Sequence, residues 1–182
     1  MMFHRTERLF LRPAFPEDWQ AVHAAIAREH IVRNLASAPW PYTQDDARAF
    51  VCKPQNGWLP DFLVTLPGTG VIGSAGLGLD ERGEPSIGYW IAEAHSARGY
   101  ATEAVCGVLE VARGLGHRRL TASHFLDNPA SGRVLLKAGF QPTGEVRPAF
   151  SLARGGHDPV ACYSIELNMC CAEPGECLPK AA

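Results

Sequence analysis

The stretch SIGYWIAEAHSARGYATEA, residues 86–104, decides the fold because its pattern changes half-way along from that of a strand to that of a helix. Residues 86–92 form an apolar run that follows a turn, which is typical of a strand. After a short loop, residues 99–114 carry apolar side chains at helical spacing and form the clearest amphipathic helix of the chain. The stretch therefore predicts a strand, a loop and a helix in direct succession.

The junction of this loop with the helix has features of a phosphate-binding site. The first backbone N–H groups of a helix have no partner within it, and the helix dipole favours an anion there. Gly99 and Ala101 let a diphosphate approach the backbone, Arg98 adds a cation, and Thr102 adds a hydroxyl. The alternative is an ordinary strand–loop–helix turn with a glycine at a tight corner, and the local pattern taken alone favours it.

The flanking segments extend the pattern into one α/β domain. Further strands are expected at residues 6–12, 61–66, 71–79, 119–125, 140–146 and 159–167. Further helices are expected at residues 16–29, 43–52 and 128–139, and Thr43 and Asn128 are placed to cap the last two. Short turns join the strands between residues 61 and 92, which indicates an antiparallel meander.

Length, composition and charge bound the function. The 182 residues suit one domain, expected at residues 1–167, with a flexible tail at residues 168–182. The net charge of −2 gives no global reason to bind nucleic acid or an anionic membrane. No secretory signal or membrane span is visible, so a cytoplasmic location is expected.

The six cysteines do not indicate a metal site. They are Cys52, Cys106, Cys162, Cys170, Cys171 and Cys177. The last three share the tail, but a fourth ligand and the paired spacing of a zinc site are missing. We expect free thiols and no metal, with Cys106 in the core.

Five segments in order along the chain resemble the GNAT N-acetyltransferases, and in particular the ribosomal-protein N-terminal acetyltransferase branch of RimJ and RimL. The segments are 6–13 (TERLFLRP), 87–91 (IGYWI), 98–104 (RGYATEA), 128–131 (NPAS) and 137–140 (KAGF). The resemblance implies an α/β (α+β) fold with a mixed, mostly antiparallel sheet of about seven strands and about four flanking helices. It also implies that the sheet splits in a V between the fourth and fifth strands, where the co-substrate acetyl-CoA inserts.

The resemblance also assigns residues to the donor site. The pyrophosphate of coenzyme A is expected on Ser96, Ala97, Arg98, Gly99, Tyr100, Ala101 and Thr102. A backbone N–H of Trp90 or Ile91 is expected at the thioester oxygen, Asn128 at the pantetheine arm, and Ser131 near the sulfur as proton donor or positioning group.

The chain departs from the family pattern at several positions. Ser96 stands where glutamine or arginine is usual, Ala97 where glycine is common, and Leu135 where many members have a tyrosine acid. Backbone amides survive the two loop changes, so we expect binding to persist. The missing tyrosine favours Ser131 as the proton donor or as the group that positions the sulfur.

The general base is less well defined. Related sequences often have glutamate directly before the Ile-Gly-Tyr run, where this chain has Ser86. Glu84 is the expected base, acting directly or through water, if the strand extends that far. Glu93, His95 and His124 are alternatives, and no base is needed if the amine arrives neutral.

The acceptor is expected to be a primary amine, either a protein N-terminus or a small molecule. Trp40, Pro41, Tyr42 and Phe150 are candidates for its pocket, although they could equally be core aromatics, and Asp158 could hold an amine. The rival function is a non-catalytic acyl-CoA-binding sensor or interaction module. The chain is expected to be a monomer or a homodimer, with no nucleic-acid or membrane partner.

Overall fold

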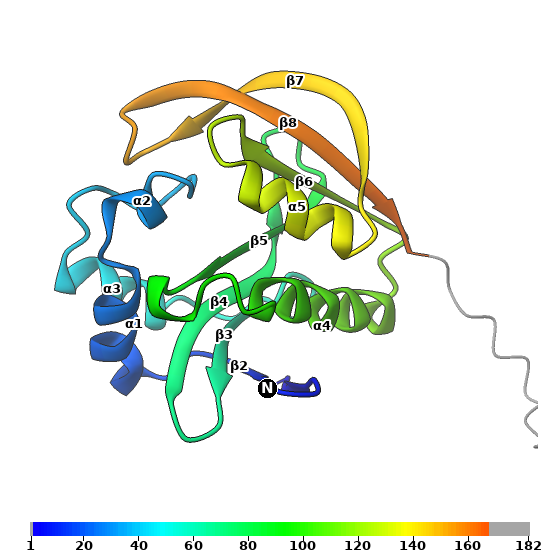
Figure 1. Cartoon of the computed structure of the whole chain (residues 1–182). Coiled ribbons are helices and arrows are strands. Elements are labelled where there is room, and N and C mark those ends of the chain that lie inside the picture. Colours follow the sequence, from blue (N-terminus) through cyan, green and yellow to red (C-terminus); the bar gives the residue numbers. More distant parts are fainter. Residues whose placement is uncertain (1, 168–182) are drawn as a thin grey trace, which may run out of the picture.

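The computed structural model describes residues 2–167 and shows one sheet of eight strands with helices on both faces (Figure 1). The strands are β1 (His4–Arg5), β2 (Phe10–Arg12), β3 (Asp61–Leu66), β4 (Gly70–Leu79), β5 (Pro85–Ile91), β6 (Arg119–Phe125), β7 (Gln141–Ser151) and β8 (Gly156–Glu166). Their order in the sheet is β1-β2-β3-β4-β5-β6-β8-β7. Within this sheet β5 and β6 are parallel and the other neighbours are antiparallel.

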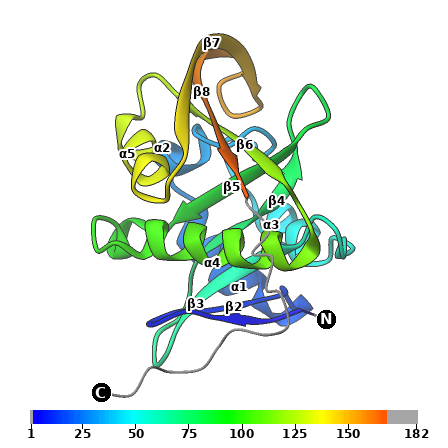
Figure 2. The same ribbon diagram turned by 90° about the vertical axis from the view of Figure 1, so that its right-hand side faces the viewer.

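Helices cover the two faces separately (Figures 1 and 2). The α-helices are α1 (Trp19–Ile26), α2 (Glu29–Val32), α3 (Gln44–Val51), α4 (Tyr100–Leu115) and α5 (Pro129–Lys137), and the short 3-10 helices are η1 (Pro16–Asp18) and η2 (Glu93–His95). The apolar faces of α4 and α5 pack on one side of the sheet, and those of α1, α2 and α3 pack on the other. Each face therefore has its own hydrophobic core.

Alternate side chains of the central strands lie in the two different cores. Phe62, Val64 and Ile72 lie in the core under α4, whereas Leu63 and Trp90 lie in the core under α1 and α3. Successive residues of a strand point to opposite faces, so strands with apolar residues at both sets of positions must be covered twice.

The sheet splits between β5 and β6. These strands pair at one position, Ser86 with Thr121, whereas β5 pairs with β4 over its whole length. The Ser86 hydroxyl donates to the Thr121 carbonyl at 3.1 Å, which fixes the closed end. The strands separate from there toward Ile91 and Phe125. The predicted V is present, and it falls between β5 and β6 because the expected first strand is divided.

That first strand and the first helix are both interrupted. The expected strand at 6–12 is wrong at its start, because the Thr6 and Leu9 backbones bond at 3.0 Å and the Thr6 hydroxyl accepts from the Leu9 N–H at 3.1 Å. This turn separates β1 from β2. The expected helix at 16–29 is likewise divided into η1, α1 and α2.

The last two strands are longer than expected. The predicted ranges, 140–146 and 159–167, omit the outer half of a hairpin that runs from Gln141 to Glu166. Pro148 and Pro159 pair within that outer half, and prolines argue against a central strand. They are tolerated because β7 is an edge strand and Pro159 lies beyond the last residue of β8 that pairs with β6.

The expected tail at residues 168–182, with three of the cysteines, lies outside the described residues. Among residues 2–167, no helix is both long enough and apolar enough to cross a membrane. Cys106 is half-buried rather than fully enclosed, although burial does raise the pKa of its thiol.

Candidate functional site

The loop before α4 makes two left-handed turns. Ala97 has φ +59° and Gly99 has φ +83°, so the chain bends sharply before the helix begins at Tyr100. A residue with a Cβ atom loses about 1 kcal/mol in the left-handed conformation, whereas glycine does not. This explains why related proteins commonly have glycine at the position of Ala97. At Gly99 an added Cβ would lie 3.4 Å from Nη2 of Arg8. The loop is therefore shaped so that its backbone is accessible.

The first turn of α4 supplies free N–H donors. The first N–H of this helix with an acceptor is that of Glu103, which bonds the Gly99 carbonyl at 3.0 Å. Within residues 2–167, no hydrogen bond engages the N–H groups of Tyr100, Ala101 and Thr102. Together with the helix dipole, these donors form a cradle for an anion. The residues present fit a diphosphate.

Arg8 braces this cradle, which the sequence analysis did not foresee. Its Nε donates to Glu103 Oε2 at 2.7 Å, its Nη1 donates to the Arg98 carbonyl at 3.2 Å, and its guanidinium lies 4.6 Å from the centre of the Tyr100 ring. Glu103 also accepts from the Thr6 hydroxyl at 2.6 Å. Arg8 and Thr6 belong to the TERLFLRP segment, but nothing in the sequence shows that this segment contacts the loop.

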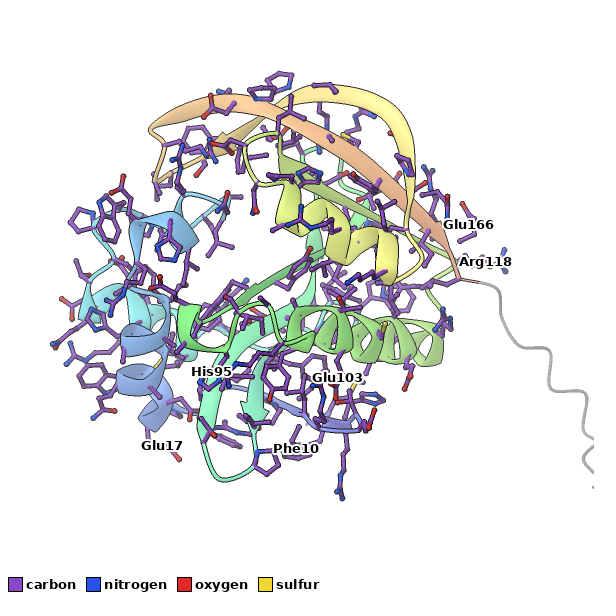
Figure 3. The ribbon with its side chains drawn as sticks, in the orientation of Figure 1. Phe10, Glu17, His95, Glu103, Arg118 and Glu166 are labelled. Carbon is purple, nitrogen blue, oxygen red and sulfur yellow. The ribbon has the colours of Figure 1, made fainter. Side chains whose placement is uncertain are left out.

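The charge of Glu103 is compensated, so the carboxylate does not repel an anion at the cradle. Burial would raise the pKa of Glu103, but its bonds to Thr6 and Arg8 outweigh burial and lower that pKa. Figure 3 shows Glu103 on α4 and His95 on the loop that precedes the helix. The Nδ1 atom of His95 is buried and has no hydrogen-bond partner among the described residues.

The edge of β5 that faces the V carries backbone N–H groups that do not bond β4. The Ala92 N–H donates to the Ile72 carbonyl on β4 at 2.8 Å. Because N–H groups alternate along a strand, the N–H groups of Tyr89 and Ile91 face β6, whereas that of Trp90 faces β4. The Trp90 side chain is buried in the core under α1 and α3. The geometry thus favours Ile91 over Trp90 as the expected donor.

A pair of hydroxyl groups spans the V. The Tyr89 hydroxyl on β5 lies 2.7 Å from the Ser131 hydroxyl on α5 and 3.0 Å from the Ser131 carbonyl. Burial raises the pKa of Tyr89 to about 12, so this phenol keeps its proton at neutral pH. The expected proton donor or positioning group, Ser131, therefore has a hydroxyl partner that the sequence analysis did not single out.

Asn128 does not cap α5 with its side chain, so that expectation is wrong. Its backbone instead forms the turn that leads into α5. The Asn128 carbonyl accepts from the Ser131 N–H at 3.1 Å, and the Asn128 N–H donates to the Phe125 carbonyl at 2.8 Å. Within residues 2–167 the side-chain amide makes no hydrogen bond. The amide is therefore available to a ligand in the V.

The candidate bases lie in different settings. Glu84 is exposed and lies in the turn before β5, which begins at Pro85, so the strand does not extend to it. Its N–H bonds Asp80 Oδ1 at 3.0 Å. Glu93 is exposed and lies 4.0 Å from Arg28. Neither carboxylate is part of the Tyr89–Ser131 pair.

His124 is held beneath α5. Its Nδ1 lies 2.8 Å from the Phe125 carbonyl and its Nε2 lies 3.2 Å from the Tyr163 hydroxyl. A Cβ at Gly132 would come within 2.5 Å of Nε2, so the glycine makes room for the ring. Because both ring nitrogens have hydrogen-bond partners, we interpret His124 as a structural residue and not as the base.

The expected acceptor residues are divided. Trp40 and Phe150 are each 41% exposed, so they can face a ligand, whereas Tyr42 is buried in the core under α1 and α3. Asp158 is bonded to Arg154 at 2.8 Å and already has a cationic partner. Within residues 2–167, no group of three or more His, Cys, Asp or Glu side chains could hold a metal ion.

Comparison with known proteins gives the family. Residues 8–141 match the family model described as the acetyltransferase (GNAT) domain. The chain belongs to the GNAT family of acetyltransferases. Among curated proteins, the uncharacterized N-acetyltransferase YoaA of Bacillus subtilis (strain 168) is 31% identical over 150 residues, which cover 78% of this chain and 84% of YoaA. YnaD of the same organism is 28% identical over 142 residues, 76% of this chain and 82% of YnaD. The protein is thus an acetyltransferase, as expected.

Solved structures share the fold. A GNAT-family acetyltransferase from Bacillus anthracis has a TM-score of 0.77 and 24% identity, and the match covers 91% of this chain and 99% of the other. The RimL ribosomal L7/L12 alpha-N-protein acetyltransferase in complex with coenzyme A has a TM-score of 0.77 and 19% identity, with 92% and 99% covered. The microcin C7 self-immunity acetyltransferase MccE, in complex with acetyl-CoA and AMP, has a TM-score of 0.72 and 18% identity, with 88% and 93% covered. The expected GNAT fold is confirmed.

Proposed function

We propose that this acetyltransferase moves an acetyl group from acetyl-CoA to a primary amine by direct attack on the thioester. The observation that carries the proposal is the alignment of three features along one path: the N–H cradle of α4, the unpaired edge of β5, and the Tyr89–Ser131 pair in the V. The solved RimL and MccE relatives, which contain coenzyme A and acetyl-CoA, support this donor.

The donor would be held at both ends. The free N–H groups at residues 100–102 bind the pyrophosphate, and Ser96, Ala97, Arg98 and Gly99 shape the approach to them. The pantetheine arm lies along β5 like an added strand, bonding the backbone of Tyr89 and Ile91. The free amide of Asn128 bonds the arm from the other side of the V.

The thioester is then activated by groups already in place. When bound, acetyl-CoA supplies an electrophilic carbonyl carbon, and the Ile91 N–H donates to its oxygen as negative charge develops there. The amine nitrogen forms a bond to the acetyl carbon while the carbon–sulfur bond breaks. Ser131 donates its proton to the leaving sulfur, and the Tyr89 hydroxyl replaces that proton through their 2.7 Å contact. Solvent then returns a proton to Tyr89, whose pKa of about 12 favours the neutral phenol.

Removal of the amine proton is the step with two candidate routes. Glu84 stays the predicted base, and from its exposed place in the turn it would act through water. The other route needs no base, because an amine that arrives neutral can lose its proton to solvent after attack. The acceptor class, a protein N-terminus or a small amine, follows the family branch.

Release of free thiol tests the proposal. The protein is incubated with acetyl-CoA and a panel of peptides and small amines, and coenzyme A thiol is followed over time. Amine-dependent release, with a matching gain of one acetyl group on the amine by mass spectrometry, is the expected result. Binding of acetyl-CoA without release for any amine would instead favour the sensor function.

A further inference from the structure

A cavity of about 390 Å³ lies beside α3, at the border between the two hydrophobic cores. It is bounded by the end of α3, the loop that follows it, the start of β3 and the end of β4. Figure 1 shows α3 beside α1 and apart from α4. Its walls are largely apolar and include Phe50, Leu59, Leu63 and Leu77. The cavity is separate from the α4 cradle, so it is not part of the donor site.

One carboxyl group lies in this apolar cavity. Asp61 is the first residue of β3, and its Oδ1 accepts a hydrogen bond from the buried Ser74 hydroxyl at 3.1 Å. The residue opposite is Gly76, where an added Cβ would lie 2.7 Å from the same oxygen. The glycine therefore leaves the space that the carboxyl occupies.

The positive charge near Asp61 does not compensate for the burial of its carboxyl group. Burial raises the pKa of Asp61, and the bonds from Ser74 and the Phe62 N–H together with the charge of Lys53 offset this only in part. Lys53 is exposed, and no salt bridge joins it to Asp61 within residues 2–167. A buried carboxylate in such surroundings is stabilised by a cation that enters the cavity.

The cavity lies beside the path to the V. Across the sheet, Asp61 pairs with Gly76, and Gly76 pairs with Gly88 on β5. A Cβ at Gly88 would meet nothing within 4 Å, and Gly88 is exposed. Two strand spacings across the sheet and the three residues from Gly88 to Ile91 along β5 put Asp61 about 14 Å from the Ile91 N–H, which faces the V. Because Gly76 and Gly88 have no side chains, none lies between the Asp61 carboxyl and β5 in this row.

We infer that the Asp61 cavity binds a second positively charged group of the acceptor, about 14 Å from the thioester position at the Ile91 N–H. The inference rests on the proposed transfer to an amine and narrows the acceptor to diamines or to molecules that carry two amines at that spacing. Asp61 recognises the distal cation, and the apolar walls contact the chain that joins the two amines.

A matched pair of acceptors tests this. Octamethylenediamine and octylamine have the same carbon chain and differ in the distal amine. For the wild-type protein, KM for the diamine should be lower than KM for octylamine by about 10-fold or more, as a charge-assisted bond provides. In Asp61→Asn, which keeps the size and the Ser74 contact, the two values should become equal while kcat for octylamine is retained.

Two further variants separate recognition from a structural effect. Lys53→Met removes the competing cation and should lower KM for the diamine, whereas Asp45→Asn on the exposed surface of α3 should leave both KM values unchanged. Equal KM values for the two acceptors in the wild type would overturn the inference and leave the acetyltransferase function intact.

If neither amine is acetylated, the affinities of the two amines for the protein test the inference. The diamine and octylamine are titrated calorimetrically into the protein saturated with coenzyme A. Diamine binding that is tighter than octylamine binding and is lost in Asp61→Asn supports the cavity assignment even though the proposed reaction failed with these acceptors. Absence of that preference overturns the assignment.

Discussion

At the scale of single residues, the donor half of the site depends on contacts between segments that are far apart in the chain. Ser131 could be singled out from its place in the NPAS segment, but its partner Tyr89 is 42 positions away and is reached across the V. Arg8 and Glu103 are 95 positions apart. Local periodicity does not contain such pairings, so the sequence predicted the donor loop without the side chains that brace it.

The hydroxyl pair gives a residue-scale prediction. Tyr89→Phe keeps the ring and removes the proton source, so kcat should fall about 100-fold while the affinity for acetyl-CoA stays within about threefold. Steady-state kinetics and calorimetry measure the two quantities. Thr65→Val, which removes a hydroxyl bonded to the Phe10 carbonyl on β2, is the control and should retain the wild-type kcat. A wild-type rate in Tyr89→Phe would remove this residue from the mechanism.

At the scale of elements, the helices with strong caps were predicted better than the strands with unusual ends. α3 begins at Gln44 after Thr43, and the expected bond from the Asp46 N–H to the Thr43 hydroxyl is present at 3.2 Å. The sequence predicts the two strands of the β7–β8 hairpin only at 140–146 and 159–167, whereas they run from Gln141 to Ser151 and from Gly156 to Glu166. Whether a proline is tolerated depends on the place of its strand in the sheet, which the sequence alone does not state.

The connection between β2 and α1 depends on an ion pair that should make stability pH-dependent. Asp18 is buried and accepts two bonds of 2.7 Å from Arg12 and one of 2.8 Å from the Phe15 N–H. Burial would raise the pKa of Asp18, but these bonds outweigh burial and hold that pKa below the usual range of an aspartate. A lowered folded-state pKa means that stabilisation is complete above the unfolded-state pKa and is lost as pH falls through the folded one.

Asp18→Asn tests this at the element scale. At pH 7 the variant should lose about 3 kcal/mol of unfolding free energy, because Arg12 is left without its partner. The difference from wild type should shrink below about pH 4, because the Asp18 carboxyl of the unfolded chain binds a proton there before the folded one does. Urea unfolding at pH 7 and at lower pH measures this. Glu17→Gln is the control, because Glu17 is exposed on the same short helix (Figure 3). A difference that does not change with pH would contradict the assignment.

Arg154 makes several of the bonds that fasten the tip of the β7–β8 hairpin, and Ser151 and Leu152 also bond the segment after α2. The Arg154 side chain is 7% exposed and bonds Asp127 and Asp158 at 2.8 Å and the Arg33 carbonyl at 2.7 Å. The guanidinium also lies 4.0 Å from the centre of the Phe125 ring. These contacts join the hairpin to the segment after α2 and to the loop that leads into α5.

Arg154→Met should therefore loosen the hairpin without disturbing the donor loop. We expect a loss of about 2 kcal/mol of unfolding free energy, since several bonds to one buried group are removed together. Hydrogen exchange should accelerate at residues 151–156 and 33–36 and stay unchanged in α4. Arg119→Met, which removes an exposed side chain near Glu166, serves as the control. Unchanged exchange at the hairpin tip would show that Arg154 does not fasten it.

At the scale of the whole molecule, the split sheet separates two tasks. The face under α4 and α5 carries the phosphate cradle and the hydroxyl pair, and the Asp61 cavity lies beside α3 at the border between the two cores. The V between β5 and β6 is the place where the two faces communicate, because the strands pair at one position there. The resemblance to the GNAT family implied the V, whereas the cavity depends on the missing side chains at Gly76 and Gly88.

The central claim is that the loop before α4 holds acetyl-CoA, and calorimetric titration of acetyl-CoA into three proteins tests it most directly. Gly99→Glu adds bulk and negative charge at the cradle, whereas Gly83→Glu makes the same change at φ +78° in an exposed turn with nothing within 4 Å. We predict that the wild type and Gly83→Glu bind alike and that Gly99→Glu loses about 100-fold or more in affinity, since a like charge then lies against the diphosphate. Equal binding by the two variants, or no binding by the wild type, would contradict the claim.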